Sequence, residues 1–451
     1  MSIARFTAPR RAVFHLLRRL HFYIGLFIAP FIFVAALSGT LYVLTPQLED
    51  LLYSDVLTVE PHGTAHPLSE QIHAARAYIG EQPPIDAVRP ASSDTETTRV
   101  QFSDPALGES QSRAVFIDPY TLQVKGDMTV YGTSGVLPLR MTIDLLHRSL
   151  LLGDLGRNYS ELAASWLWIA ALGGVILWLG TRPKRTQKSP RKGFALQRHW
   201  HTTLGLVLFL GLIFVSITGL TWSQWAGNNI GKLRTEMNWL TPQVNTSLHH
   251  HAAAPADPHA EHHAMAGMHM SMTNATDSAW DHVLHAARQN GIDATKLELR
   301  QPKNADSAWT VTEIDRQWPT QVDAVAVNPH DFTILDHIYF DQFPLMAKLT
   351  RWGVDAHMGV LFGLPNQILM ALFGLGLCSM IVFGYRMWWI RRPKMDETHP
   401  LQTLTEAWLA LPLALKACCL LLAIGLGVAL PAMGISLLLL IVVDLYRWRR
   451  Q

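Results

Sequence analysis

The stretch His21-Phe-Tyr-Ile-Gly25-Leu26 returns 180 positions later as His201-Thr-Thr-Leu-Gly205-Leu206. The same offset pairs Ser38-Gly39 with Thr218-Gly219, so the register holds over a whole apolar run. Similarity at a fixed offset indicates that one structural unit occurs twice in the chain. We therefore expect a duplicated fold in which His21 and His201 occupy equivalent places.

Farther along the chain the offset becomes 210. Residues 115–119 match residues 325–329, and His147 matches His357. The second copy is therefore about thirty residues longer, and the gain coincides with a His/Met-rich insert at 248–273. Each copy holds an even number of predicted spans, so the two share one orientation and are related by a pseudo-two-fold axis along the membrane normal.

Four long runs without Asp, Glu, Lys or Arg predict transmembrane helices, because about 20 apolar residues cross the ~30 Å of hydrocarbon. They are residues 22–44, 162–180, 202–231 and 358–385. A fifth apolar region, 407–443, carries only Lys416 and is interrupted at Pro431, which predicts two short helices. We expect six spans, at 13–45, 159–181, 199–226, 357–390, 404–430 and 431–448.

The orientation follows from basic residues, which are retained in cytoplasmic loops. Five arginines precede the first span, and the predicted cytoplasmic loop 182–198 holds seven Lys or Arg residues and no acidic residue. We expect a bacterial inner-membrane protein with both termini in the cytoplasm and two periplasmic segments, 46–158 and 227–356. The net charge of +2 gives no sign of nucleic-acid binding.

Each periplasmic segment has the pattern of a helix followed by strands. Residues 68–79 and 280–289 are helix-like, and short runs such as 98–102 and 309–313 have strand composition. The predicted fold class is a polytopic α-helical membrane protein. It consists of a duplicated helix, α+β domain and helix unit, followed by a C-terminal helical hairpin.

Four histidines occupy matched repeat positions. His21 and His201 lie at the cytoplasmic ends of the first and third spans, and His147 and His357 precede the second and fourth spans on the opposite side. Paired imidazoles facing each other across a helix bundle make an axial site for haem iron that favours electron transfer. We expect two b-type haems, one near each membrane face.

Two other histidines compete for the cytoplasmic site. His199 has no repeat partner, because position 19 is Arg, which favours His201. The sequence leaves open whether His199 or His15 replaces His201 or His21. On the opposite side Arg140, Arg148 and Arg351 lie near the second pair and are candidates for contacts to haem propionates through charge-assisted hydrogen bonds. Solvated arginines at the membrane interface are the alternative.

The sequence resembles a known family in three motifs: His21-x-x-x-Gly25-Leu26 with Ser38-Gly39, the run from His147 to Gly156, and Val115-x-x-Asp118-Pro119. Over about residues 13–395 the chain is similar to the PepSY-associated transmembrane helix family. This resemblance implies periplasmic PepSY domains and a di-haem electron path, as in iron-regulated inner-membrane proteins and ferrisiderophore reductases.

The second copy departs from the family motif. Arg148 is replaced by Met358, and Gly156-Arg157 by Asn366-Gln367.

The chain lacks a Rossmann fingerprint, a P-loop or a flavin motif, so a cytoplasmic reductase or the quinol pool must supply the electrons. The leading hypothesis is a haem-containing metalloreductase that reduces a periplasmic ferric siderophore and so releases Fe(II). A copper-handling membrane protein is the alternative. A regulatory module with structural histidines is a third reading.

The insert at 248–273 carries the residues of the copper hypothesis. Thioethers beside imidazoles suit copper, and imidazole clusters also accept other transition metals. Its surroundings of Ala and small polar residues predict a disordered accessory loop. The candidate ligands are His249, His250, His251, His259, His262, His263, Met265, Met268, His269, Met270 and Met272.

Deletion of residues 248–273 is expected to abolish tight copper binding and to leave haem content and haem reduction unchanged, because the first copy lacks the insert. Copper titration and the visible spectrum of the purified deletion variant measure both. A loss of haem on deletion would instead place the insert in the electron path.

Overall fold

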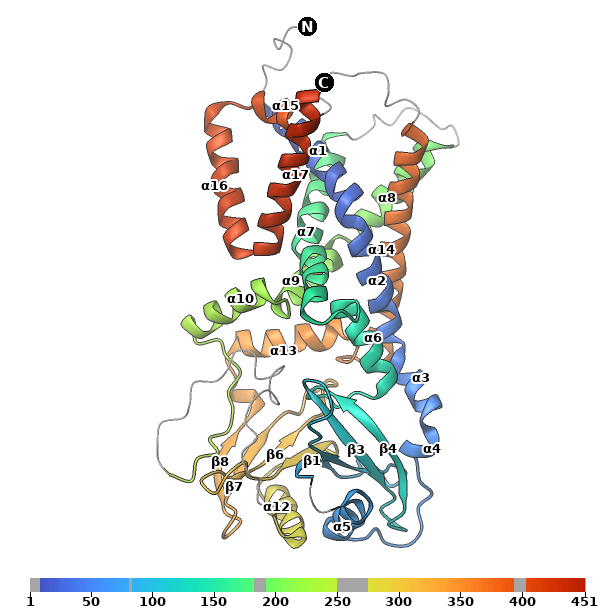
Figure 1. Ribbon diagram of the computed structural model, residues 1–451, viewed down its shortest axis with the longest axis vertical. Helices are drawn as coiled ribbons and strands as arrows, with labels where there is room; N and C mark the ends of the chain where they lie inside the picture. Colours follow the sequence, from blue (N-terminus) through green and yellow to red (C-terminus); the bar gives the residue numbers. More distant parts are fainter. Residues whose placement is uncertain (1–8, 81–82, 182–191, 250–274, 393–402, 451) are drawn as a thin grey trace. The chain divides into compact units, whose positions relative to one another are not determined.

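The computed structural model describes residues 9–80, 83–181, 192–249, 275–392 and 403–450 (Figure 1). The chain divides into two compact units. The first, called the membrane unit, comprises Met1–Val43, Ile143–Lys232 and Ile368–Gln451. The second, called the sheet unit, comprises Leu44–Thr142 and Leu233–Gln367.

Four helical stretches of the described chain are long and apolar enough to cross a membrane. They are Arg11–Val43, which joins α1 (Pro9–Tyr23), η2 (Ile24–Ile28) and α2 (Ala29–Val43), then α7 (Gly153–Gly180), α14 (Leu364–Arg391) and α17 (Pro431–Arg450). Residues 199–226, predicted as one span, contain two helices, α8 (Phe194–Val207) and α9 (Phe209–Thr221), that meet at 61°. Counted as one broken span, this pair is the fifth.

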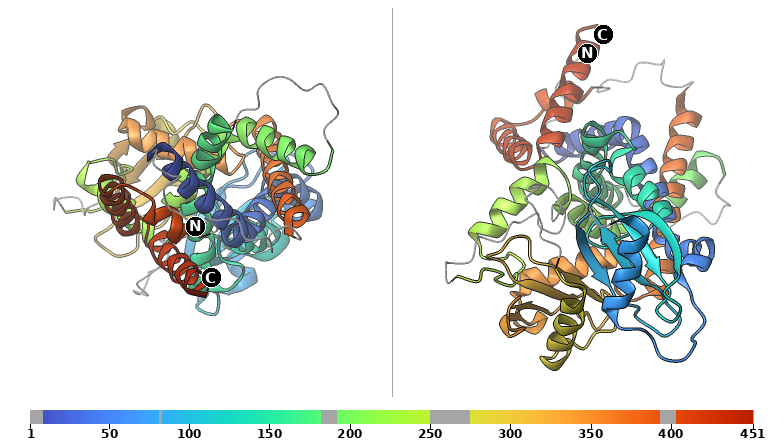
Figure 2. Two further views of the ribbon diagram at one scale, coloured as in Figure 1. Left: turned by 90° about the horizontal axis from the view of Figure 1, so that it is seen from above. Right: turned by 60° about the horizontal axis from the view of Figure 1, so that its bottom comes forward.

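The region predicted as the fifth span, 404–430, contains a short helix, α15 (Leu404–Leu409), and the apolar α16 (Leu413–Ala429). α16 packs along α17 as a hairpin (Figure 2). The buried carboxylate of Asp444 on α17 accepts hydrogen bonds from the backbone nitrogens of Leu404 (2.9 Å) and Thr405 (2.7 Å) and from the Tyr23 hydroxyl. A carboxylate at a helix N-terminus is favourable, so Asp444 joins the C-terminal helices to α1.

The sheet unit contains one antiparallel sheet with the strand order β4-β3-β2-β1-β5-β6-β7-β8. The two α+β modules predicted from the sequence therefore share a single sheet. β1 and β5 pair at its centre through Val88 and Leu299. The strands are β1 (Ile85–Arg89), β2 (Thr98–Phe102), β3 (Gln111–Ile117), β4 (Val124–Tyr131), β5 (Leu297–Arg300), β6 (Trp309–Glu313), β7 (Ala324–Val327) and β8 (Ile334–Ile338).

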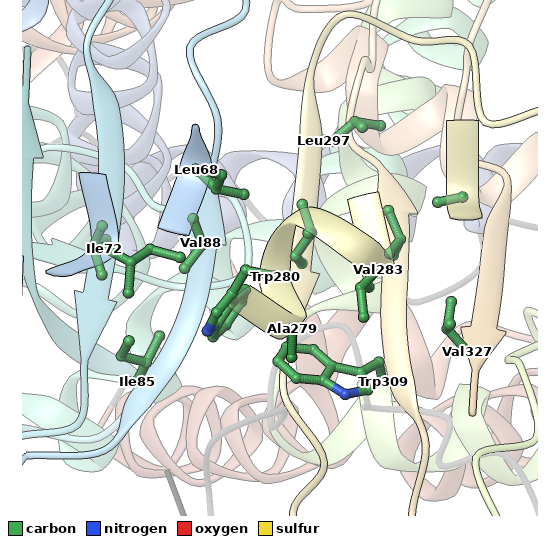
Figure 3. Close-up of a cluster of buried hydrophobic side chains, with 14 of the residues drawn as sticks. Leu68, Ile72, Ile85, Val88, Ala279, Trp280, Val283, Leu297, Trp309 and Val327 are labelled. Carbon is green, nitrogen blue, oxygen red and sulfur yellow. The ribbon is translucent and has the colours of Figure 1, made fainter. Parts of the chain in front are cut away.

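Two helices, α5 (Leu68–Ile79) and α12 (Asp277–Gln289), lie side by side and cover one face of this sheet (Figure 1). Their apolar sides and the strands form one core, in which Trp280 meets Trp309 edge to face at 4.7 Å between ring centroids (Figure 3). Asp281 of α12 accepts a hydrogen bond from Leu68 N at 2.8 Å and so caps α5. The core therefore joins both halves of the sheet.

The remaining short helices lie at the ends of the larger elements. They are α3 (Thr45–Leu52), α4 (Ser54–Leu57), α6 (Pro138–Ser149), α10 (Trp225–Glu236), η3 (Phe340–Gln342) and α13 (Leu345–His357).

A buried ion network crosses the centre of the sheet. Glu298 on β5 accepts hydrogen bonds from Arg89 Nε of β1 at 2.8 Å and from Arg300 Nε at 2.7 Å, and it is 7% exposed. Burial alone would raise the pKa of Glu298, but Arg300 and Arg89 outweigh this effect and lower the pKa from 4.5 to about 2. The ionised carboxylate therefore stabilises the β1–β5 junction.

Glu298→Gln is expected to destabilise the sheet unit by about 3 kcal/mol at pH 7, the free energy that corresponds to the lowered pKa of Glu298. Because the folded-state pKa is depressed, this stabilisation is complete above about pH 4.5 and is lost as the pH falls towards 2. Hydrogen exchange of the β1 and β5 amides, compared between variant and parent at equal pH, measures it.

The exchange rates should differ by about 100-fold at pH 7 and should converge as the pH falls to about 2. Glu60→Gln, a change at an exposed carboxylate, is the control. A difference of the same size at both pH values would contradict the assignment to Glu298 ionisation.

Candidate functional site

A cavity of about 460 Å³ lies inside the membrane unit and contains both His21 and His201. Its walls come from α1, η2, α7, α8 and α14, with further contacts from α2 and α9. The wall is mostly apolar, which is expected for a ligand pocket between membrane helices. The two histidines predicted at the cytoplasmic ends of the first and third spans thus lie in one cavity.

The imidazoles of His21 and His201 are neighbours, with ring centroids 6.4 Å apart and planes inclined by 78°. Each ring rests against a glycine. A Cβ atom on Gly174 would lie 3.4 Å from His21 Cε1, and one on Gly384 would lie 3.4 Å from His201 Cε1. Larger residues at these two positions would push the imidazoles or fill the cavity.

The hydrogen bonds of His201 set its tautomer. Nδ1 lies 2.9 Å from the carbonyl oxygen of Met380, and because a carbonyl only accepts, Nδ1 carries the proton. Nε2 then keeps its lone pair, the state in which an imidazole ligates a metal. In the first copy the equivalent carbonyl is that of Ala170, which lies near His21. The buried His21 Nδ1 nevertheless forms no hydrogen bond of good geometry.

Both copies depart from regular α-helix within about two turns after the histidine. η2 is a π-helix over Ile24–Ile28, and the break between α8 and α9 falls at Leu208, which is 180 positions after Ile28. Such distortions are frequent at functional sites because they shift the side chains on either side. Pro30, which has no N–H to donate to the Leu26 carbonyl, follows η2 and is a sequence signal for the first distortion, whereas no proline lies near Leu208.

The cavity wall follows the offsets of the sequence repeat. All lining residues except Ile24 and Ala29 have a partner in the lining, seven pairs at an offset of 180 and eight at 210. Pairs at 180 include Phe14 with Phe194 and Gly25 with Gly205, and pairs at 210 include Gly174 with Gly384 and Trp178 with Trp388.

Three arginines also line the cavity: Arg18, Arg198 and Arg391. All three are exposed, so they mark the place where the cavity meets solvent. Among the described residues, those that line the cavity include no Asp or Glu. The sequence reasoning missed these arginines, although Arg-x-x-His occurs at both Arg18 and Arg198 and would have identified two of them.

The second pair of predicted haem ligands is divided between the units. His147, in the last turn of α6, belongs to the membrane unit, and its Nδ1 lies 3.0 Å from Ala35 O and 3.1 Å from Ser38 Oγ. Its ring also packs on Gly39, where a Cβ would come within 3.1 Å of Cε1. His357 ends α13 and belongs to the sheet unit, so its pairing with His147 stays a prediction.

The arginines predicted near propionates have different surroundings. Arg351 lies 3.3 Å from the fully buried carboxylate of Asp355, which also meets Arg316 at 2.7 Å. Arg140 lines a separate polar cavity of about 580 Å³ in the sheet unit. The carbonyl of Arg148 accepts a hydrogen bond from Ser160. A propionate contact for any of the three stays a prediction.

One motif departure of the second copy, Asn366 in place of Gly156, has a local explanation. In the first copy Gly156 approaches the carbonyl of Ser149 so closely that a Cβ would collide with it. In the second copy Asn366 replaces this glycine, and its Nδ2 donates a hydrogen bond to Ala356 O at 3.0 Å. A side-chain hydrogen bond thus replaces a close backbone approach in the turn that follows His357.

The candidate copper ligands lie outside the described residues, except His249. His249 Nε2 is 3.3 Å from Asp306, and the His249 side chain is exposed. In the described part of the chain, no cluster of three or more His, Cys, Asp or Glu residues has metal-binding geometry. The competing histidines His15 and His199 are described, and neither lines the cavity that holds His21 and His201.

Comparison with known proteins identifies one family. The model described as the PepSY-associated TM region matches residues 18–391. No curated protein matches the chain. The match and the long apolar helices together identify a membrane protein.

Proposed function

Because the chain belongs to the family of the PepSY-associated TM region, we propose that it is a di-haem electron-transfer protein of the bacterial inner membrane that reduces a periplasmic ferric siderophore. The observation that carries the proposal is the pair of facing imidazoles, His21 and His201, inside an apolar cavity of the membrane unit. When bound, haem supplies one-electron transfer between its ferrous and ferric states.

The donor set of this cavity fits haem better than a free metal ion. Transition metals in proteins usually need four or more donors, and the cavity offers two imidazoles. A porphyrin brings the other four nitrogens itself. His21 and His201 would hold the haem through their imidazole nitrogens, since both rings lie in the cavity with centroids 6.4 Å apart.

The proposed gene duplication accounts for the equal roles of the two histidines. The strand order of the sheet is symmetric about its centre: the first strands of the two halves, β1 and β5, are neighbours, and the last strands, β4 and β8, lie at the edges. The paired lining of the cavity obeys the same repeat. A two-fold axis between His21 and His201 would present chemically identical donors to the two faces of one planar ligand.

The second haem is proposed between His147 and His357. The contact of His147 Nδ1 with Ala35 O resembles that of His201 Nδ1 with Met380 O. In each case the carbonyl holds the Nδ1 proton and leaves Nε2 for a ligand. Haems on opposite faces of the membrane would form an electron path through the bilayer.

The proposed direction of electron flow is from the cytoplasm to the periplasm. Arg18 and Arg19 of α1, Arg391 at the end of α14, and Arg449 at the end of α17 flank the spans as cytoplasmic residues do. This orientation would place the sheet unit in the periplasm. One electron reduces the bound Fe(III) to Fe(II), and a hard-oxygen chelator that favours Fe(III) then releases the iron.

His21→Ala and His201→Ala are each expected to remove about half of the haem, because either change deletes one axial donor of one site. Pyridine haemochrome analysis per purified chain measures the loss. His147→Ala should remove the other half, and His199→Ala is the matched control because His199 lies two residues from His201 but outside the cavity lining. Full haem retention in the first three variants would sink the ligand assignment.

Dithionite-reduced protein is expected to be reoxidised by a ferric siderophore, with release of Fe(II). Stopped-flow absorption follows the haem bands, and a ferrous chelator traps the released iron. His147→Ala should slow the reaction at least about tenfold, because the path to the periplasmic face would be interrupted. Absence of reoxidation by hydroxamate, catecholate and carboxylate siderophores would exclude this substrate class.

A further inference from the structure

We propose that Arg18, Arg198 and Arg391 bind the two propionate carboxylates of the haem that His21 and His201 hold. This inference rests on the proposed function and adds a binding site for the anionic edge of the ligand. It places the propionates at the end of the cavity where these arginines meet solvent.

The charge of the cavity wall supports an anionic group at this end. Three guanidinium groups line the cavity, and no carboxylate among the described lining residues compensates them. Arginine binds carboxylates through paired, charge-assisted hydrogen bonds. An apolar cavity with cations at one end suits an amphipathic dianion such as haem and does not suit an uncharged quinone.

The helix geometry places Arg18 and Arg198 on the same helix faces as His21 and His201. Arg18 precedes His21 by three residues on α1, and Arg198 precedes His201 by three residues on α8. Residues three apart lie on the same helix face, about one turn from each other. Each histidine therefore has an arginine next to it on the side that faces the cavity.

The arrangement matches the symmetry of the ligand. The two propionates are related by a two-fold axis of the porphyrin ring, and Arg18 and Arg198 are related by the sequence repeat. One carboxylate is thus available for each arginine.

Arg391 is the point where the copies differ, because its partner at the offset of 210 is Thr181. Arg198 Nη2 donates a hydrogen bond to Thr181 Oγ1 at 2.8 Å, and the Arg391 guanidinium stacks on Phe194 at 3.9 Å. Two of the three cations are therefore held in place by neighbours, which lowers the entropy cost of binding a carboxylate.

Retention of basic residues at the cytoplasmic face does not by itself explain this placement. That rule places arginines near the membrane surface but does not select which of them line a cavity. Arg11 and Arg19 lie on α1 with Arg18, and Arg392 directly follows Arg391, the last residue of α14; all three are absent from the lining. Arg392 instead faces the ring of Trp389 at 5.2 Å. It is an internal control, one residue from Arg391.

The test compares haem with haem dimethyl ester, in which both propionates are neutral. The full-length chain, in a His147→Ala background that leaves the haem of this cavity, is stripped and reconstituted with either ligand. We expect the parent to release haem to apomyoglobin at least about tenfold more slowly than it releases the ester. The triple variant Arg18→Gln, Arg198→Gln, Arg391→Gln should lose this preference while keeping a bis-histidine spectrum.

Single variants keep the proposal testable if the triple variant does not fold. Arg391→Gln should speed haem loss about threefold or more and leave ester loss unchanged, whereas Arg392→Gln should change neither rate. If haem and ester leave every variant at parental rates, the propionates bind elsewhere and the inference is wrong. If the parent binds no haem, or His21→Ala retains it fully, the proposed function fails instead.

Discussion

The cost of placing polar groups inside an apolar helix bundle governs the membrane unit. With little water available there, a buried donor or acceptor needs a partner from the protein or from a ligand. Glu161 on α7 illustrates a solution within the chain, because its carboxylate accepts hydrogen bonds from Trp225 N at 2.8 Å and Ala226 N at 3.1 Å. Asp444 does the same for α15. In these cases a charged side chain satisfies a helix end.

The two facing histidines are different, because some of their imidazole nitrogens have no hydrogen-bond partner in the described part of the chain. One nitrogen of His201 is held by a carbonyl, and His21 Nδ1 has no hydrogen bond of good geometry. Gly174 beside His21 and Gly384 beside His201 have no side chain, so the helix surface next to each imidazole is flat. A structural pair of histidines would be expected to pack against larger side chains or to bond each other. The cavity that both histidines line thus supports the proposal that they hold a ligand.

Much of this organisation could be predicted from the sequence, because it depends on local periodicity and on the repeat. The helix at 68–79 has the predicted bounds, and His21 and His201, which the repeat predicts to face each other, are neighbours. The single sheet could not be predicted, because its central pair, Val88 with Leu299, joins strands more than 200 residues apart. The break at Leu208 has no proline to mark it, so helical periodicity predicted one continuous span there.

Several pairs of residues that line the cavity have the same residue type at both positions. A cavity that had only to be filled by neighbouring helices would keep its volume and let its residue types vary. Among the paired lining residues, the identical ones include the imidazoles, the glycine beneath each imidazole, and Arg18 with Arg198. Aliphatic positions are mixed, since Leu26 matches Leu206 and Leu167 matches Leu377, whereas Ala170 pairs with Met380 and Ala171 with Ile381. The two imidazoles thus have similar surroundings in the cavity, because both the histidines and the glycines that contact them recur at matched positions.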